Sequence, residues 1–249
     1  MVDERETRSE LLPVARRVVM MSGGSRGIGS AIARRLLHEG YGLSLGGRRP
    51  AEIAKKFASA ENPPLVSKFE AFDPTTAESW LAAALDHFGR VDALINNAGA
   101  TKPLSFTEGD EAVLDELWAV NVKAPYRLIR LALPHLRKSG HGRIINIAST
   151  DAKRYRDASV SIAYAATKHA VLALSHAAKF AGWEDGVRVT ALCPGAVDTD
   201  FAAGIAGVTP GPNRIAPTTI AETVAFLLRL PNNSSVAELV VNARLESTL

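Results

Sequence analysis

The sequence predicts a three-layer α/β protein, in which helices cover both faces of a doubly wound parallel sheet of about seven strands. Short apolar runs typical of buried strands alternate with helical patterns along the whole chain. No Pro/Ser-rich linker, internal repeat or low-complexity run divides this alternation. We therefore expect a polar tail over residues 1–13 and a single domain over residues 14–249.

The first half of the chain contains strands and helices in strict alternation. Predicted strands span 17–21, 41–47, 65–71 and 91–95, and predicted helices span 31–39, 51–60 and 75–88. Gly40 marks the end of the first helix, because glycine readily adopts the left-handed conformation that closes helices. Helical crossovers between successive strands make the strands parallel.

The second half continues the alternation with longer helices. A long helical pattern covers about 108–137, and strand 143–148 precedes a helix that ends near Gly182. Strand 187–192, helix 217–229 and strand 238–241 complete the predicted sheet. The intervening segment from Phe201 to Pro217 is short and rich in Gly and Pro, so we expect a small, mobile lid.

Composition excludes several classes of partner. The net charge is only +3 and the sequence contains no run of Lys or Arg residues, so we expect no nucleic-acid or membrane binding. Residues 1–10 lack the apolar stretch of a signal peptide, and no apolar run is long enough to span a bilayer. The only cysteine, Cys193, precludes an internal disulfide. These features predict a cytoplasmic protein.

The first strand is followed at once by a glycine-rich loop, residues 22–29, and then by a helix. Glycines allow the backbone to approach a pyrophosphate closely, and a helix N-terminus offers free N–H groups and a partial positive charge. The order of strand, loop and helix therefore predicts a dinucleotide site.

The end of the second strand indicates which dinucleotide binds. NAD enzymes usually place an Asp or Glu there for the ribose 2′-hydroxyl, but this chain has Gly47-Arg48-Arg49. Arg26 and Arg48 are predicted to form a fork around a 2′-phosphate, because guanidinium groups match phosphate oxygens bidentately. We therefore expect NADP rather than NAD, which remains the less favoured alternative.

A tyrosine and a lysine share one helical face near the end of the strand at 143–148. Of the four tyrosines, only Tyr164 has a lysine four residues later, Lys168. A free tyrosine titrates near pH ~10, so a neighbouring cation is needed to make it an acid or base at neutral pH. Ser149 follows the strand at the edge where α/β sheets usually bind ligands. These three groups predict an active site.

With these residues in place, the chain resembles the short-chain dehydrogenase/reductase family from about residue 17 to 242, which implies a Rossmann-type fold. The resemblance implies a catalytic tetrad of Asn121, Ser149, Tyr164 and Lys168. It also implies cofactor contacts from the glycine loop, the adenine pocket, the segment after the fourth strand and the nicotinamide segment. The predicted cofactor-binding residues are Ser22, Gly23, Ser25, Arg26, Gly27, Ile28, Gly29, Arg48, Asp73, Asn97, Ala98, Gly99, Tyr164, Lys168, Pro194, Gly195, Val197 and Thr199.

The family resemblance implies hydride transfer between NADP(H) and a secondary alcohol or ketone. Negative charge develops on the carbonyl oxygen during this step, so Tyr164 is expected to donate a proton and Ser149 to orient the carbonyl. Lys168 is expected to lower the pKa of the phenol and to hold the nicotinamide ribose. Asn121 is expected to bind a water that connects the lysine to solvent. The nearby Pro125 favours this, because it removes a helical N–H and frees carbonyl groups.

Three questions stay open at this level. The expected substrate is a small carbonyl or alcohol compound. One alternative substrate is a 3-oxoacyl thioester on a carrier protein, which would dock near residues 153–156, Arg127 and Arg130. A second alternative is that the protein is not an enzyme but an NADP-binding regulator. Residues 153–157 form either a basic contact for an anionic substrate or a solvated loop. The helix after Ser161 is apolar nearly all round, which predicts a homodimer or homotetramer.

No metal site is expected. The six histidines show no HExxH or paired ligand spacing, and the chain has no CxxC motif. Cys193, between Leu192 and Pro194, is expected to be a small buried hydrophobic residue rather than a nucleophile.

Overall fold

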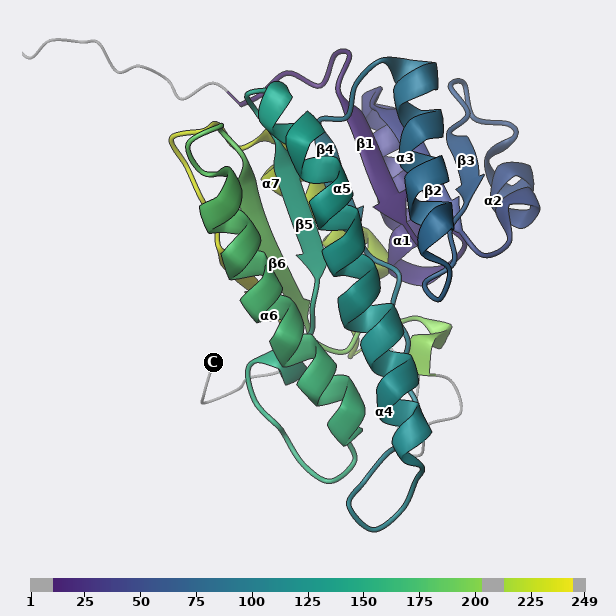
Figure 1. The fold of residues 1–249 in the computed structure, drawn as a ribbon, viewed down its shortest axis with the longest axis vertical. Helices are drawn as coiled ribbons and strands as arrows, with labels where there is room; N and C mark the ends of the chain where they lie inside the picture. Colours follow the sequence, from purple (N-terminus) through teal and green to yellow (C-terminus); the bar gives the residue numbers. More distant parts are fainter. Residues whose placement is uncertain (1–10, 203–212, 244–249) are drawn as a thin grey trace, which may run out of the picture.

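The fold is a seven-stranded parallel sheet in the order β3-β2-β1-β4-β5-β6-β7, seen in a computed structural model that describes residues 11–202 and 213–243 (Figure 1). Every neighbouring pair of strands is parallel. The strands are β1 (Val18–Ser22), β2 (Gly42–Gly47), β3 (Leu65–Lys68), β4 (Ala93–Asn96), β5 (Arg143–Ile147), β6 (Arg188–Pro194) and β7 (Glu238–Val241).

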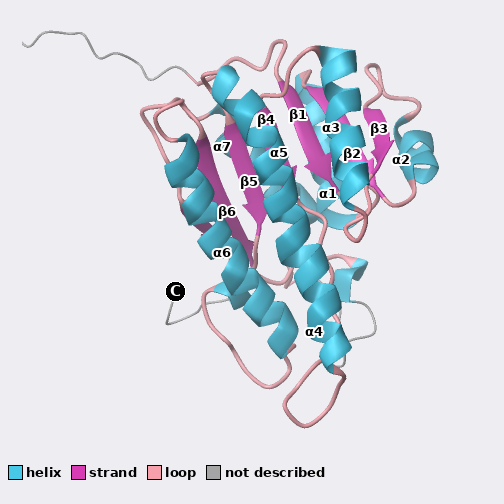
Figure 2. Ribbon diagram, viewed as in Figure 1, coloured by secondary structure: helices cyan, strands magenta, loops and turns pink. Residues whose placement is uncertain are grey.

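Helices cover both faces of the sheet, as Figure 2 shows. Helices α3, α5 and α6 lie on one face, and α1, α2 and α7 pack against the other. The α-helices are α1 (Gly27–Glu39), α2 (Pro50–Phe57), α3 (Pro74–Phe88), α4 (Glu111–Trp118), α5 (Ala124–Lys138), α6 (Ile162–Gly182) and α7 (Pro217–Arg229). The predicted three-layer, single-domain α/β fold is confirmed.

Successive side chains of each strand pack alternately into two separate hydrophobic cores. Val19 and Met21 of β1 pack toward α1 and α7, whereas Met20 packs toward α3 and α5. Strand β4 divides in the same way, with Ile95 in the first core and Leu94 in the second. Since a strand turns successive side chains to opposite faces, an all-apolar run is what a strand covered on both faces requires.

The predicted long helix at 108–137 is broken into three parts. Helix α4 passes into a π-helical segment, Ala119–Lys123, and then into α5. Pro125 lies two residues after this segment and has no N–H to donate to the carbonyl of Asn121, so the regular pattern of helical hydrogen bonds is interrupted there. The sequence argument from Pro125 foresaw an interruption but not its π geometry.

Several predicted boundaries also differ by a few residues. Strand β3 ends at Lys68 rather than at residue 71, and α1 begins at Gly27 because the last glycines of the loop already form its first turn. Most of the predicted lid, residues 203–212, lies outside the described residues, as do residues 1–10 of the polar tail. Within the described part of the chain, no helix is long and apolar enough to cross a membrane.

Sheet order reverses between β1 and β4. From β1 the chain winds through β2 to β3 at one edge, and then returns to β4 on the other side of β1. In open α/β sheets a crevice forms beyond the carboxyl ends of the strands at such a switch point. The ends of β1, β4, β5 and β6 therefore define the place where a ligand is expected.

Candidate active site

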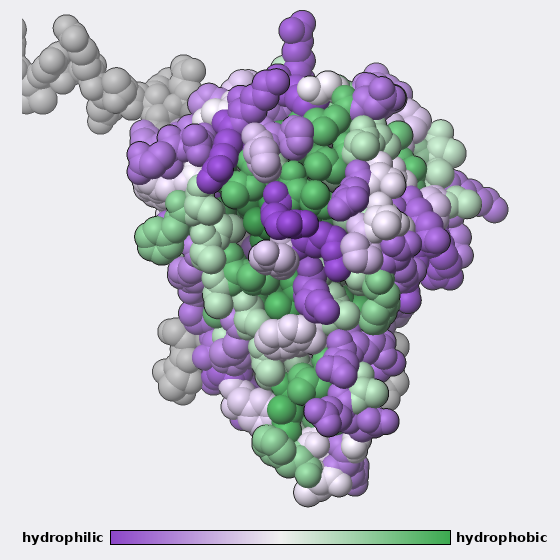
Figure 3. Space-filling model, viewed as in Figure 1, coloured by the Kyte–Doolittle hydropathy of each residue, from purple (hydrophilic) through white to green (hydrophobic). Residues whose placement is uncertain are grey.

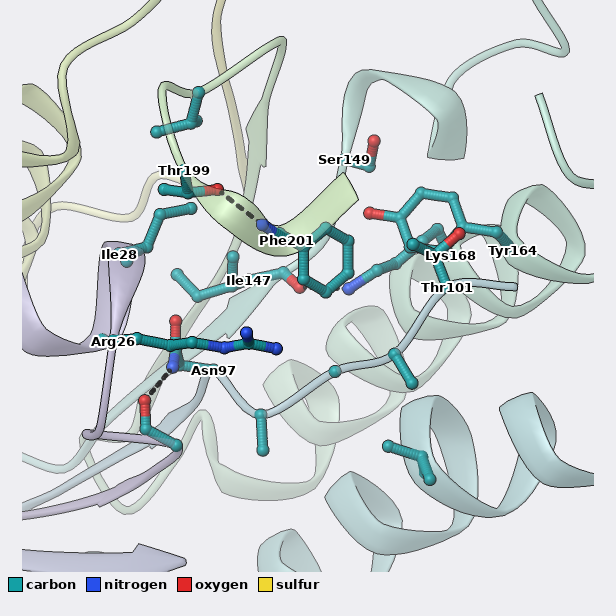
Figure 4. A pocket seen from close by; sticks show the side chains of 18 of the residues that line it. Arg26, Ile28, Asn97, Thr101, Ile147, Ser149, Tyr164, Lys168, Thr199 and Phe201 are labelled. Carbon is teal, nitrogen blue, oxygen red and sulfur yellow. Dashed lines mark hydrogen bonds between the residues drawn. The ribbon is translucent and has the colours of Figure 1, made fainter. Parts of the chain in front are cut away.

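A cavity of about 500 Å³ lies at the carboxyl ends of these strands. Its walls come from the β1–α1 loop, the ends of β2, β4, β5 and β6, and the first turns of α6 (Figure 4). Cavities of this size are typical of small-molecule and cofactor sites. The cavity joins segments that are far apart in the sequence.

The glycine loop is compressed against the segment after β4. A Cβ built on Gly29 would lie 1.9 Å from the Gly23 carbonyl oxygen and 2.4 Å from Asn97 Nδ2. Gly23 and Gly27 have φ values of 79° and 52°, which favour glycine. No side chain caps the N-terminus of α1 at Arg26, so the first backbone N–H groups of this helix remain open to an anion.

Ser22 holds this loop in place and does not line the cavity. Its Oγ accepts hydrogen bonds from the backbone N–H groups of Asn97 and Ala98, at 3.2 and 3.1 Å. Asn97 returns the contact, since its Nδ2 donates to the carbonyl oxygens of Ser22 and Gly23 at 3.1 and 2.7 Å. These bonds fasten β1 to the end of β4 and fix the floor of the cavity.

Ser149, Tyr164 and Lys168 converge on the opposite wall. Figure 4 shows the Ser149 side chain above the Tyr164 hydroxyl, with the Lys168 ammonium below the phenol ring. Lys168 Nζ lies 5.5 Å from the centre of the Tyr164 ring and donates a hydrogen bond to the Ile147 carbonyl at 2.7 Å. The Ser161 side chain caps helix α6 by accepting a hydrogen bond from the Tyr164 backbone N–H, which fixes where the helix begins.

Burial determines the protonation of this pair. It raises the pKa of Tyr164 above its ordinary value, although hydrogen bonding to Ser149 opposes this, and it lowers the pKa of Lys168 to about 8. The net shift of the phenol pKa is therefore upward, because desolvation is its largest cause, and the predicted lowering by Lys168 does not determine it. At neutral pH, Tyr164 carries a proton that it can donate.

Asn121 lies behind this wall, within the π-helical segment, and does not line the cavity. Its side chain accepts from the Ala100 N–H at 2.9 Å and donates to the Ala100 carbonyl at 2.9 Å and to Thr167 Oγ1 at 3.0 Å. Thr167 lies one residue before Lys168, so Asn121 ties α6 to the segment that follows β4. Its proposed role with a bound water stays a prediction.

Most predicted cofactor residues are brought together. Those that line the cavity are Gly23, Ser25, Arg26, Gly27, Ile28, Gly29, Arg48, Asn97, Ala98, Gly99, Tyr164, Lys168, Pro194, Gly195, Val197 and Thr199. Asp73 is not among them: its carboxylate caps α3 by accepting from the Thr75 N–H and hydroxyl, at 3.0 and 2.7 Å. Its predicted contact with adenine gains no support from this geometry.

The cavity also contains residues that the sequence reasoning missed. Asp151 enters from the turn after Ser149, and the Phe201 ring lies with its centre 6.0 Å from that of Tyr164. Arg156, in the loop singled out for a possible basic contact, also lines the cavity, whereas Lys153 forms an ion pair with Glu238 of β7. Asp151 lies only two residues after Ser149, and this closeness in the sequence could have indicated that it lines the same cavity.

The environment of Cys193 agrees with its prediction. Cys193 is fully buried, and burial raises the pKa of its thiol to about 11, so it is a packed hydrophobic residue. Residues 11–202 and 213–243 contain no cluster of three or more His, Cys, Asp or Glu that would hold a metal ion.

Known proteins resemble this chain over most of its length. Agropine synthesis reductase of Rhizobium rhizogenes is 36% identical over 231 residues, which cover 92% of this chain but 53% of the relative, so the chain spans about half of that protein. An alcohol dehydrogenase from Thermococcus sibiricus, solved with 5-hydroxy-NADP, is 32% identical with a TM-score of 0.81, and the match covers 92% and 99% of the two chains.

The structure of a third relative contains NADH instead of an NADP compound. This 3-ketoacyl-(acyl-carrier-protein) reductase from Brucella melitensis, in complex with NADH, is 25% identical with a TM-score of 0.82, and the match covers 91% and 97% of the two chains.

Residues 17–207 match the family described as short chain dehydrogenase. This range contains the glycine loop, Ser149, Tyr164 and Lys168, which the structure joins in one cavity. The chain therefore belongs to the short-chain dehydrogenase/reductase family of oxidoreductases.

Proposed function

We propose that this protein is an NADP(H)-dependent oxidoreductase that interconverts a secondary alcohol and a ketone, with Tyr164 as the general acid and base. The observation that carries the proposal is the convergence of Ser149, Tyr164 and Lys168 in the same cavity as the glycine loop. The family membership supports the same chemistry at CH–OH and carbonyl groups.

The residues present fit a dinucleotide. The glycine loop packs so closely on itself and on Asn97 that a Cβ at Gly29 would not fit, and the uncapped N-terminus of α1 lines the cavity. When bound, the nicotinamide supplies or accepts a hydride. Tyr164 donates its proton to the carbonyl oxygen as negative charge develops there, and the Ser149 hydroxyl orients that oxygen. The Lys168 ammonium stabilises the phenolate that remains.

Two arginines support NADP over NAD. Arg26 and Arg48 both line the cavity, at the N-terminus of α1 and just after β2. Figure 4 shows Arg26 extended across the cavity. In our proposal these guanidinium groups contact the 2′-phosphate that distinguishes the two cofactors, as in the fork inferred from the sequence.

Replacing Arg48 with Ala is expected to weaken NADPH binding by about tenfold to 100-fold and to change NADH binding little, because a charged hydrogen bond contributes about 1.5–3 kcal/mol. Titration of nicotinamide fluorescence measures both affinities. Arg137→Ala is the control, because Arg137 is paired with Asp185 in an exposed salt bridge and does not line the cavity. A parent protein that binds NADH more tightly than NADPH would contradict the assignment.

The reduction rate is expected to fall as the pH rises above about 8, the pKa to which burial lowers Lys168. Below this pH the ammonium is charged and stabilises the developing phenolate; above it the charge is lost, and kcat/KM should fall about tenfold per pH unit. A pH series of NADPH oxidation measures this. In the Lys168→Arg variant the guanidinium stays protonated in this pH range. If kcat/KM of this variant still falls near pH 8, the fall is caused by another group.

A carrier-bound 3-oxoacyl thioester is the alternative substrate, favoured by the likeness to the Brucella reductase. Arg156 at the cavity supplies a basic contact for a carrier phosphate. Arg127 is less suited, since it donates to the Ala71 carbonyl at 3.1 Å. A non-catalytic NADP-binding regulator is disfavoured by the intact set of Ser149, Tyr164 and Lys168.

The proposed assembly is a homodimer or homotetramer. Aromatic side chains on α4, α5 and α6 are exposed in the single chain, among them Trp118, Tyr126 and Phe180, which is 79% exposed. Figure 3 shows hydrophobic side chains gathered over this face. Large exposed apolar patches are typical of subunit interfaces. In this proposal the protein acts in the cytoplasm on small molecules.

The proposal is tested by titrating the purified protein with NADPH and NADH, and then following NADPH oxidation with a panel of ketones, keto acids and 3-oxoacyl thioesters. Turnover of one class supports the reaction and names the substrate group. NADPH binding without turnover of any class would contradict the reductase proposal and favour the regulator.

A further inference from the structure

A lysine on helix α2 is bonded to the glycine loop. Lys56 Nζ donates a hydrogen bond to the Ser25 carbonyl oxygen at 2.8 Å, although the two residues are 31 positions apart in the chain. The Ser25 carbonyl carbon is covalently bonded to the backbone nitrogen of Arg26, and both Ser25 and Arg26 line the cavity. The hydrogen bond therefore holds the Lys56 ammonium beside the part of the loop from which Arg26 extends.

Arg48 reaches the same place from the end of β2. Strands β1 and β2 are neighbours, and the Gly23 N–H donates a hydrogen bond to the Gly46 carbonyl oxygen at 2.9 Å. The segments that carry Arg26 and Arg48 therefore leave the sheet side by side. Helix α2 begins directly after these segments meet and brings Lys56 back to the loop. Three basic side chains from three elements thus gather around the start of α1.

The charges of these side chains are directed to the cavity rather than to acids. Among the residues that the structure describes, Lys56, Arg26 and Arg48 form no ion pair with a carboxylate. Arg49, at the start of α2, is by contrast paired with Glu52. Basic groups that gather without acidic partners attract an anion, and they do so most strongly when the anion carries more than one charge.

The bond to Ser25 also changes the field that an anion meets at the loop. A carbonyl oxygen carries partial negative charge and repels a phosphate nearby. Lys56 binds this oxygen and places a full positive charge next to it. This charge adds to the partial positive charge at the N-terminus of α1, which no side chain caps.

We propose that Lys56 is a third specificity-determining residue of the 2′-phosphate site, and that it favours NADP over NAD together with Arg26 and Arg48. This inference rests on the proposed preference for NADP. The two-arginine fork inferred from the sequence does not include this lysine. The 2′-phosphate of NADP carries nearly two negative charges at neutral pH, and NAD lacks it. Loss of the Lys56 charge therefore weakens the binding of NADPH and leaves that of NADH nearly unchanged.

The test is the variant Lys56→Met, because methionine keeps an unbranched stem of similar length and removes the charge. We expect NADPH to bind about fivefold more weakly than to the parent, and NADH less than about twofold more weakly, in titrations of nicotinamide fluorescence. Adenosine 2′,5′-bisphosphate and AMP, used as competitors, should show the same difference without a nicotinamide ring. Lys56→Arg keeps the charge and should restore NADPH binding to within about twofold of the parent.

Lys55→Met is the matched control. Lys55 is also exposed on α2, and within the described part of the chain its side chain makes no hydrogen bond to the glycine loop, so neither affinity should change. Equal weakening of NADPH and NADH in Lys56→Met would show that Lys56 only supports the loop. That result, or an unchanged NADPH affinity, overturns the inference and leaves the reductase proposal intact. A parent that binds NADH as tightly as NADPH contradicts the proposed cofactor preference itself, and the inference fails with it.

Discussion

Tyr164→Phe is expected to lower kcat for ketone reduction by about 10²–10⁴-fold, the usual contribution of a positioned general acid. The substitution removes one hydroxyl and leaves the ring, which packs beside Phe201 and above the Lys168 ammonium. Ser149 and Lys168 stay in place to bind the carbonyl and the cofactor. NADPH affinity should therefore stay close to that of the parent, and the loss should appear in kcat.

Tyr155→Phe is the control for this variant. Tyr155 also carries a phenol near the cavity, but its hydroxyl donates to the Val160 carbonyl at 2.8 Å, within the loop that precedes α6. Removal of this bond should change kcat by less than about tenfold. Rates are measured by NADPH oxidation under saturating substrate. If Tyr164→Phe turned over at the parent rate, the proton would come from another group and the proposed role of Tyr164 would be wrong.

The fold was predictable because its signal is local. Each strand of a doubly covered sheet must be apolar on both faces, and runs such as residues 18–21 meet this requirement without reference to the rest of the chain. Parallel strands end at one edge, so the loop after β1 and Ser149 after β5 were expected to meet although they are about 120 residues apart in the sequence. The convergence of the site thus follows from topology.

The side-chain details were less predictable, because they depend on distances that no local pattern encodes. Ser22 was expected to contact the cofactor, yet the register between β1 and β4 places its hydroxyl under the N–H groups of Asn97 and Ala98. The effect of Lys168 on Tyr164 was expected from helical spacing alone, but desolvation by the surrounding fold outweighs it. Burial and hydrogen-bond partners are properties of the assembled structure.

Gly29→Ala is expected to weaken NADPH binding by about 100-fold and to lower the free energy of unfolding by about 1–3 kcal/mol, the usual cost of overpacking. The new methyl group would lie 1.9 Å from the Gly23 carbonyl oxygen and 2.4 Å from Asn97 Nδ2. The carbonyl belongs to the backbone and cannot rotate away as a side chain can. The loop must therefore shift relative to α1 and to the end of β4.

Such a shift damages binding more than stability, because the phosphate site consists of backbone N–H groups whose directions the loop sets. Gly24→Ala tests this reasoning within the same loop. Its methyl group would lie 3.0 Å from Leu45 Cδ1, the end of a flexible side chain that can move, so binding should change little. Fluorescence titration and thermal unfolding measure the two effects separately. Equal losses of NADPH affinity in both variants would show that the loop tolerates no substitution, and that the close approach of Gly29 to Gly23 is not what holds the site together.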